Sequence, residues 1–256
     1  MFDIYKCEML KLKNTKLYWA ICLPAVIGNL VSIMVMLPKI TTSGEVASAN
    51  LQEIFYRQGN VLTILGPFMF ALISGYIISR EYSDRTINQL FTYPISRSSI
   101  FTAKLCVIFT MIFLTSALSS VTVIFLGIVK VLTGAASFNM LIDGIRMNIL
   151  TCLLSFGTVP LAAAISMVGK SVIPSMVLGT FASLVTLFLE IGHGMGSILF
   201  PWTTPYLPVR EFGEGFAEIG QNPYTMIAII ILVVIFLISL AFCQIYYRKS
   251  EVHSGS

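Results

Sequence analysis

Six apolar runs, each long enough to cross a lipid bilayer as a helix, constrain the fold of this chain most strongly. At ~1.5 Å per residue, about 20 helical residues cross a hydrocarbon core of ~30 Å. Only 11% of the residues are charged, whereas about a quarter is usual in a soluble globular protein. We therefore predict an all-α membrane protein, a single transmembrane domain over residues 1–256 with six spans. The spans cover about residues 17–37, 61–79, 101–129, 147–168, 172–191 and 224–247. Residues 39–60 and 130–146 are expected to form outer loops, and Pro160 predicts a kink in the fourth span.

The basic residues between these runs predict the orientation. Six spans place both termini on one side, and the basic residues on that side are Lys6, Lys11, Lys13, Lys16, Arg80, Arg85, Arg97, Lys104, Lys170, Arg248 and Lys249. On the other side are Lys39, Arg57, Lys130, Arg146 and Arg210. Because basic residues concentrate in cytoplasmic loops, both termini are expected in the cytoplasm. The basic residues are not gathered on one face, so no nucleic-acid partner is expected.

Residues 1–16 have the pattern of an amphipathic helix. Phe2, Tyr5, Met9 and Leu12 form one helical stripe, with lysines interspersed. Such a helix is expected to lie in the membrane interface, with its apolar face towards lipid and its lysines towards anionic headgroups. The alternative is a disordered basic leader that only sets the orientation.

A polar segment, residues 80–100, separates the second and third runs. Ile87, Leu90 and Phe91 follow helical spacing within it. Ser83 or Asp84 can cap the start of a short helix. Tyr93-Pro94 ends it, because proline disfavours a helical residue before it. This pattern predicts a short helix outside the membrane with one apolar face for docking. The alternative is an ordinary cytoplasmic loop whose basic residues follow the topology rule.

This segment resembles the coupling segment of type-2 ATP-binding-cassette (ABC) exporter permeases. The resemblance lies in Glu81, Thr86, Leu90, the run from Tyr93 to Arg97 (YPISR), and Lys104. It implies a coupling helix in residues 80–100, a re-entrant outer segment in 192–223, and a second permease, identical or related. It also implies a cytoplasmic ABC ATPase dimer that holds ATP and Mg, with no cofactor on this chain. The expected ATPase-coupling residues are Glu81, Asp84, Arg85, Ile87, Leu90, Phe91 and Arg97.

Within that family, residues 1–15 and the FPWTTPYLP segment at 200–208 are most similar to permeases that protect Gram-positive bacteria against lantibiotics and bacitracin. This similarity implies a bacterial cell membrane protein that exports an amphipathic or hydrophobic peptide. The family's pathway lies between two permeases, lined mainly by spans two and five. In this chain those spans offer the apolar side chains Phe68, Phe70, Tyr76, Met176, Phe181 and Phe188.

The outer segment is rich in proline and glycine. Its apolar start, Met195 to Trp202, is too short to cross the bilayer, so we expect it to dip into the outer leaflet and return. Glu190 and Trp202 are expected at the outer mouth. Glu190 and His193 have a spacing that can converge on a metal, but no further His or Cys is near, and tight sites need about three or four protein ligands. No metal is predicted.

No catalytic grouping is found, so the chain is not expected to be an enzyme. Ala164 to Ser171 (AISMVGKS) comes close to the phosphate-binding pattern but lacks its first glycine and follows a membrane helix. ATP hydrolysis is therefore expected on a separate subunit. The middle thirds of the six spans contain no ionisable residue, although ion-coupled carriers usually place such groups there. The alternative to transport is a membrane subunit that senses or sequesters its ligand in a signalling complex.

Overall fold

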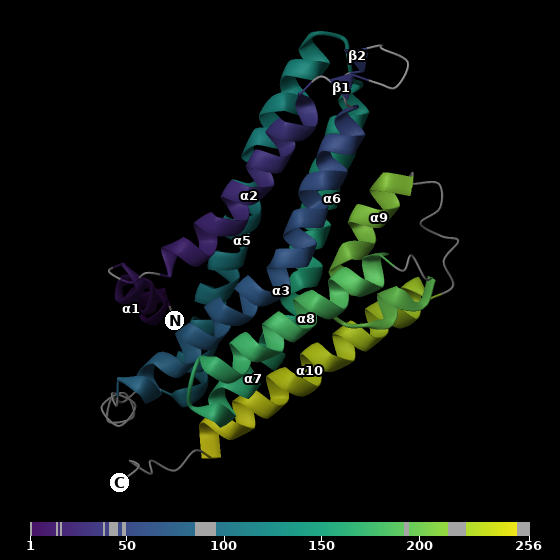
Figure 1. The fold of residues 1–256 in the computed structure, drawn as a ribbon. Helices are drawn as coiled ribbons and strands as arrows, with labels where there is room; N and C mark the ends of the chain where they lie inside the picture. Colours follow the sequence, from purple (N-terminus) through teal and green to yellow (C-terminus); the bar gives the residue numbers. More distant parts are fainter. Residues whose placement is uncertain are drawn as a thin grey trace.

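The computed structural model describes residues 2–13, 15, 17–37, 39–40, 46–47, 50–84, 96–191, 195–214 and 224–249. The predicted helical fold is confirmed: apart from two short antiparallel strands, the regular structure of these residues is helical (Figure 1). The elements are α1 (Phe2–Leu12), α2 (Tyr18–Met36), β1 (Lys39–Ile40), β2 (Val46–Ala47), α3 (Leu51–Ser83), α5 (Arg97–Leu132), α6 (Phe138–Ser155), the 3-10 helix η1 (Phe156–Thr158), α7 (Val159–Gly169), α8 (Ile173–Ile191), the 3-10 helices η2 (Met195–Leu199) and η3 (Thr204–Tyr206), α9 (Leu207–Glu214) and α10 (Thr225–Lys249).

Five helical stretches in the described part of the chain are long and apolar enough to cross a membrane. They are Leu51–Ser83, Arg97–Leu132, Phe138–Gly169, Ile173–Glu190 and Thr225–Arg248. The apolar part of α2, Ile21–Met36, is shorter. The first predicted span therefore corresponds to α2, and a sixth crossing remains a prediction.

The fourth span is kinked, as its proline predicts. Residues 138–169 form α6 and α7, which are joined by the 3-10 turn η1. Pro160 stands in the first turn of α7, where its missing N–H leaves no hydrogen bond unmade. The interruption at η1 lets Gly157 approach α10, where an added Cβ would lie 2.5 Å from the side chain of Leu232.

Two predicted outer loops are shorter than the sequence suggested. Residues 51–60 belong to α3 and not to a loop over residues 39–60, because Leu51, Ile54 and Phe55 form a buried helical stripe. Likewise α6 begins at Phe138, so the expected loop over residues 130–146 is reduced to a short turn. Gly134 in that turn has φ +73, a backbone conformation that favours glycine.

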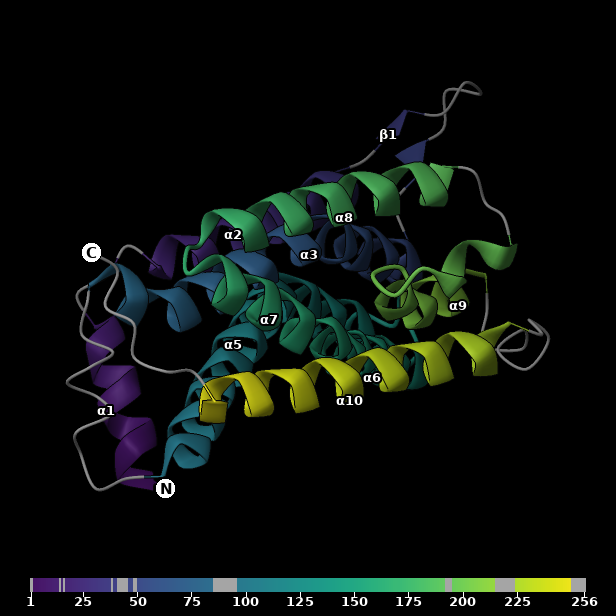
Figure 2. The ribbon, with the colours of Figure 1, turned by 90° about the horizontal axis from the view of Figure 1, so that it is seen from below.

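The long helices form one bundle, and the two ends of the bundle contain different elements (Figures 1 and 2). At one end α1 meets the last turns of α3 and the first turns of α5, beside the end of α10. We call this the α1 end. At the other end the start of α3 packs against the start of α6 and against η3 and α9. We call this the α9 end.

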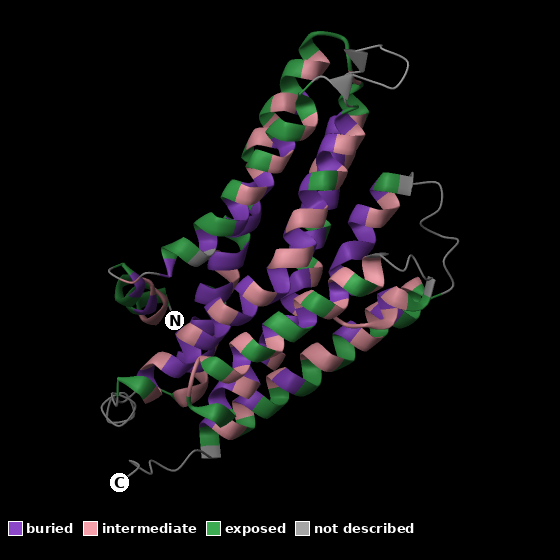
Figure 3. Cartoon of the chain, in the orientation of Figure 1, coloured by how far each residue is buried: buried purple, intermediate pink, exposed green. Residues whose placement is uncertain are grey.

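Helix α1 lies across the bundle and not along it (Figure 2). Part of its predicted apolar stripe packs on the core: Leu12 is buried, and Tyr5 and Met9 are half-buried against it, whereas Phe2 is exposed. The Tyr5 hydroxyl lies 3.0 Å from Thr110 Oγ1 of α5. Buried residues line the facing sides of the helices throughout the bundle (Figure 3). The alternative of a disordered leader is therefore wrong for residues 2–12.

Candidate functional site

Four charged side chains meet at the α1 end of the bundle. Lys104 Nζ of α5 lies 3.0 Å from Glu8 Oε2 and 3.0 Å from Glu81 Oε1. Lys11 Nζ lies 2.5 Å from Glu8 Oε1 and 3.1 Å from Glu81 Oε1. We call Glu8, Lys11, Glu81 and Lys104 the charge cluster. Its two acids and two bases join three helices that are far apart in the sequence.

Three members of the charge cluster are buried, whereas the Lys11 side chain is 40% exposed. Glu8, Glu81 and Lys104 are only 6%, 5% and 1% exposed. The Lys104 ammonium also donates to the carbonyl of Ile77, 3.4 Å away. The guanidinium of Arg80 donates to the backbone carbonyl of Lys11 at 2.6 Å, so a side chain of α3 also binds the backbone at the end of α1. Because removing one partner of a buried ion pair leaves an uncompensated charge, we expect the loss of a single buried member of the cluster to be strongly destabilising.

The ionisation of the cluster predicts how stability depends on pH. Burial opposes the charge of Glu8, but Lys104 and Lys11 outweigh it and lower the pKa of Glu8 below its ordinary 4.5. Burial likewise opposes the charge of Lys11, but Glu8 and Glu81 outweigh it and raise its pKa above 10.5. The Glu8 contribution is therefore complete above pH 4.5 and is lost as the pH falls through the lowered pKa. The Lys11 contribution is lost only above pH 10.5.

We expect a Glu8→Gln variant to unfold at a lower temperature than the wild type at pH 7, because Gln cannot compensate the two lysines. The difference should shrink steadily as the pH falls below about 4.5, where the wild-type carboxylate itself becomes protonated. Thermal unfolding in detergent between pH 7 and pH 3 measures this. A difference that stayed constant down to pH 3 would contradict the pKa shift.

The charge cluster lies next to the predicted coupling segment. Residues 85–95, which include the predicted coupling residues Arg85, Ile87, Leu90 and Phe91, lie outside the described residues. On either side of them, α3 ends at Ser83 and α5 begins at Arg97. Ser83 is the last residue of α3, and Asp84 is its C-terminal cap. The predicted start of a separate helix after them lies outside the described residues. Ser96 caps α5 by accepting from the Ser99 amide at 3.2 Å.

The other predicted coupling residues differ in where they point. Glu81 is buried within the charge cluster, so its carboxylate contacts this chain's own lysines. Asp84 is exposed and pairs with Arg80 at 3.3 Å. Arg97 donates to the carbonyl of Arg248 at 3.1 Å and so connects the start of α5 to the end of α10.

The predicted pathway residues lie on two helices that pack together, α3 and α8. Their contact is close because both helices carry small residues. A Cβ added at Gly179 of α8 would lie 2.7 Å from the Ala71 side chain and 2.9 Å from the Pro67 carbonyl. Phe70 is buried, Phe68, Tyr76 and Met176 are half-buried, and Phe181 and Phe188 are 60% and 70% exposed. The two exposed phenylalanines give α8 an apolar outer face.

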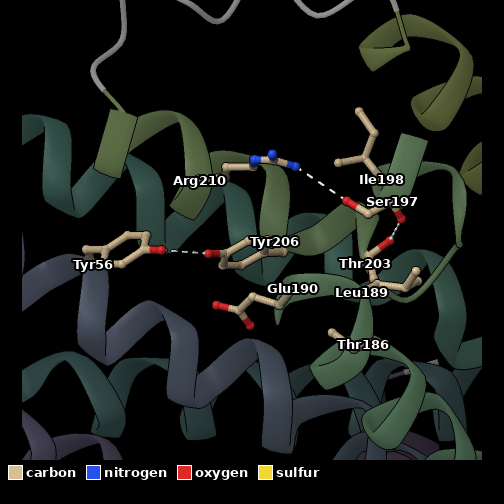
Figure 4. A pocket seen from close by; sticks show the side chains of 9 residues that line it. All are labelled: Tyr56, Thr186, Leu189, Glu190, Ser197, Ile198, Thr203, Tyr206 and Arg210. Carbon is tan, nitrogen blue, oxygen red and sulfur yellow. Dashed lines mark hydrogen bonds between the residues drawn. The ribbon is translucent and has the colours of Figure 1, made fainter. Parts of the chain in front are cut away.

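A small polar pocket lies at the α9 end, where Glu190 ends the candidate span of α8 (Figure 4). Its volume is about 40 Å³, and Tyr56, Tyr206 and Arg210 line it with Glu190. The hydroxyls of Tyr56 and Tyr206 lie 3.0 Å apart, and Arg210 Nη1 donates to Ser197 Oγ at 3.4 Å. Burial, the Tyr56 hydrogen bond and the Glu190 charge raise the pKa of Tyr206, so its hydroxyl remains protonated.

Of the two residues predicted at the outer mouth, Glu190 lines this pocket and Trp202 does not, and the mouth itself remains a prediction. Trp202 lies apart from Glu190, beside a second small cavity of about 10 Å³ that Phe70 also lines. His193 lies outside the described residues. Sequence reasoning missed Tyr56, because it assigned residues 39–60 to a loop, and it missed Arg210. Residues 195–214, part of the predicted re-entrant segment, form η2, η3 and α9, with Val209 fully buried.

Two other chemical possibilities can be compared with the structure. Among the described residues, no group of three or more His, Cys, Asp or Glu side chains could hold a metal ion. The residues before Gly169 and Lys170 form helix α7, whereas a phosphate-binding loop follows a strand. The segment from Ala164 to Ser171 is therefore a helix end and a turn.

The fold defines a multi-pass membrane protein, and comparison with known proteins identifies its family. Residues 4–186 match the model of the ABC-2 family transporter proteins, so this chain belongs to that family. Its members are transport subunits of ABC transporters and are not enzymes themselves. The chain is also 25% identical to the bacitracin transport permease protein BCRB of Bacillus licheniformis, over 194 residues. The match covers 75% of this chain and 88% of the relative.

Proposed function

We propose that this permease subunit exports an amphipathic antimicrobial peptide of the bacitracin or lantibiotic type, driven by a separate ABC ATPase dimer. The observation that supports this most is the similarity to a bacitracin transport permease over three quarters of the chain. The chain would work in a bacterial cell membrane with a second permease, identical or related. The α1 end would face the cytoplasm, in agreement with the distribution of basic residues.

An external energy source fits the positions of the charges. The buried charged residues of the described chain, Glu8, Glu81 and Lys104, all belong to the cluster at the α1 end. Ion-coupled carriers instead place ionisable groups near the middle of their spans. Moving a two-state protein from ~1:99 to ~99:1 requires about 5.5 kcal/mol of differential binding, and nucleotide-driven closure of an ATPase dimer can supply it.

The charge cluster suggests how that motion would reach the spans. Residues 85–95 connect α3 to α5, and the cluster connects both helices to α1 a few residues away. An ATPase that moves the connecting segment would therefore move three helices as one unit. The motion would continue along α3 to its close contact with α8, where the predicted peptide pathway begins.

The partner ATPase is tested by co-expression. The permease and a candidate ATPase from a neighbouring reading frame should copurify, and the complex should raise the bacitracin tolerance of a sensitive host. We expect Leu90→Asp to abolish the tolerance, because a charge on the apolar docking stripe prevents contact with the ATPase. Leu132→Asp, at an exposed residue of the α9 end, is the matched control. A Leu90→Asp complex that still copurifies and still protects would contradict the proposed docking.

The same assay separates transport from sensing. A sensor or sequestering subunit would retain its signal when the ATPase carries a substitution that blocks hydrolysis, and would not lower the cell-associated amount of labelled peptide. An exporter no longer protects the host when ATP hydrolysis is blocked, and the amount of cell-associated peptide then rises to the level seen without the permease. The second result is the one we expect.

The outer pocket is expected to affect the release of the peptide. We predict that Glu190→Gln lowers the rate of ATP-dependent export by about tenfold or less without lowering stability, because the pocket loses its carboxylate while its shape is retained. The control is Glu53→Gln, a more exposed acid at the same end of the bundle. Export by purified Glu190→Gln permease at the wild-type rate would exclude a role for this carboxylate.

A further inference from the structure

A large apolar groove runs between α7 and α10, away from the sites described above. Its volume is about 580 Å³, within the range of about 300 to 1,000 Å³ that small-molecule sites occupy. Leu161, Ile165 and Val168 of α7 form one wall, and Ile235, Ile238 and Phe242 of α10 form the other. Both helices belong to candidate membrane spans, so hydrocarbon surrounds the groove where the chain crosses a bilayer.

The side chains that line the groove offer no free hydrogen-bond donor to an occupant. Its hydroxyl side chain, Ser239, already bonds the carbonyl oxygens of its own helix, at 2.6 Å to Ile235 and 3.1 Å to Phe236. The other lining residues are aliphatic, aromatic, glycine or proline. Peptide or headgroup donors of an occupant inside the groove would have almost no hydrogen-bond partners, which makes their burial there unfavourable. The wall chemistry therefore selects a hydrocarbon chain.

A positive charge stands at the α1 end of the groove. Gly169 lines the groove, and Lys170 follows it directly in the turn between α7 and α8. Lys170 is exposed and has φ 48, a left-handed conformation that is uncommon for residues other than glycine. The turn lies at the α1 end, because Ser166 donates to the carbonyl of Gly75, close to the end of α3. An apolar groove with an exposed lysine one residue beyond its Gly169 end matches a lipid, with the acyl chain along the helices and the headgroup at the surface.

We propose that the α7–α10 groove is a binding site for a bilayer phospholipid with an anionic headgroup. One acyl chain occupies the groove, and the headgroup phosphate pairs with Lys170. A second permease is another possible occupant of the groove. It is expected to face the predicted pathway, however, and the exposed phenylalanines of that pathway lie on α8. Figure 2 places α8 and α10 on opposite faces of the bundle. The charge at one end of the groove also favours a molecule with one anionic group and one apolar chain.

Spin-labelled phospholipids test the site without the ATPase or a transported peptide. The permease is reconstituted in vesicles that contain spin-labelled phosphatidylglycerol or phosphatidylcholine, and electron paramagnetic resonance measures the motionally restricted fraction. We expect Ile165→Trp, which fills the groove, to remove restricted lipid. The matched control, Ile230→Trp, changes an exposed residue of α10 outside the groove and should remove none. Thermal unfolding is measured as well, to establish that both variants are folded.

The headgroup is tested separately by Lys170→Asn, which removes the charge and tolerates the left-handed backbone. We expect the preference for phosphatidylglycerol over phosphatidylcholine to fall by about fivefold, since one basic residue near a membrane surface contributes ~1 kcal/mol. Lys6→Asn removes an exposed lysine of α1 that does not border the groove, and should lower the preference clearly less than Lys170→Asn does. Equal preferences in both variants would overturn the headgroup assignment. The acyl-chain site would be wrong if both tryptophan variants had the same fraction of restricted lipid. It would also be wrong if Ile165→Trp separated two paired permeases and left the restricted lipid unchanged.

Discussion

A Lys104→Met substitution is expected to destabilise the permease by about 3–5 kcal/mol, the largest stability effect that the structure predicts. Lys104 is 1% exposed, and its ammonium lies 3.0 Å from both Glu8 and Glu81. Methionine fills a similar volume but leaves two buried carboxylates with only Lys11 between them. Equilibrium unfolding in mixed detergent micelles measures the loss of free energy.

Two further variants separate charge from volume. Lys6→Met changes an exposed lysine of α1, at the same end of the bundle as Lys104, and should cost no more than about 0.5 kcal/mol. The double variant Glu81→Gln/Lys104→Met leaves Glu8 paired with Lys11, so it should cost clearly less than Lys104→Met alone. If the double variant were as unstable as the sum of its single variants, the cluster would not be a coupled network.

The second large effect is expected at the contact between α3 and α8. Gly179→Leu would place a bulky side chain where a Cβ alone meets the Ala71 side chain at 2.7 Å and the Phe68 backbone at 3.0 Å. Backbone cannot move aside as a flexible side chain can, so the helices must separate, at a cost of about 1–3 kcal/mol or more. Because these helices line the predicted pathway, we expect peptide export to fall to background.

The control for this substitution is Gly196→Leu. A Cβ added at Gly196 has no atom within 4 Å, and this residue is exposed near the α9 end. We expect wild-type stability and export from that variant. If Gly179→Leu were also stable and active, the close α3–α8 contact would have no part in stability or in transport.

Long apolar runs allowed the helical class to be predicted, but the ends of the helices were harder to predict. Residues 51–60 contain Gln52, Glu53 and Arg57, so their composition suggested a loop. Their apolar residues nevertheless follow helical spacing, and the charges lie on the outer face, where Arg57 pairs with Glu53 at 3.9 Å. Periodicity was therefore the better guide at that boundary. The error also concealed Tyr56, which lines the outer pocket.

The charge cluster could be predicted only in part. Glu8 stands three residues after Tyr5 and four before Leu12, on the apolar face of the helix, where a carboxylate needs a partner. That signal was present in the sequence. Its partners, Glu81 and Lys104, are separated from it by 73 and 96 residues, so only the tertiary structure brings them together. The family resemblance rested on both Glu81 and Lys104 and predicted a coupling role for Glu81, but it gave no indication that the two residues pair with each other.

The central claim is that the charge cluster transmits the work of an ATPase into the transport pathway. The most direct test uses the Glu81→Gln/Lys104→Met variant, reconstituted in proteoliposomes with its ATPase, and measures ATP hydrolysis and bacitracin transport together. The account predicts a folded complex that still hydrolyses ATP but moves little or no peptide. Wild-type transport per ATP hydrolysed by this variant would contradict it and leave the cluster with a purely structural role.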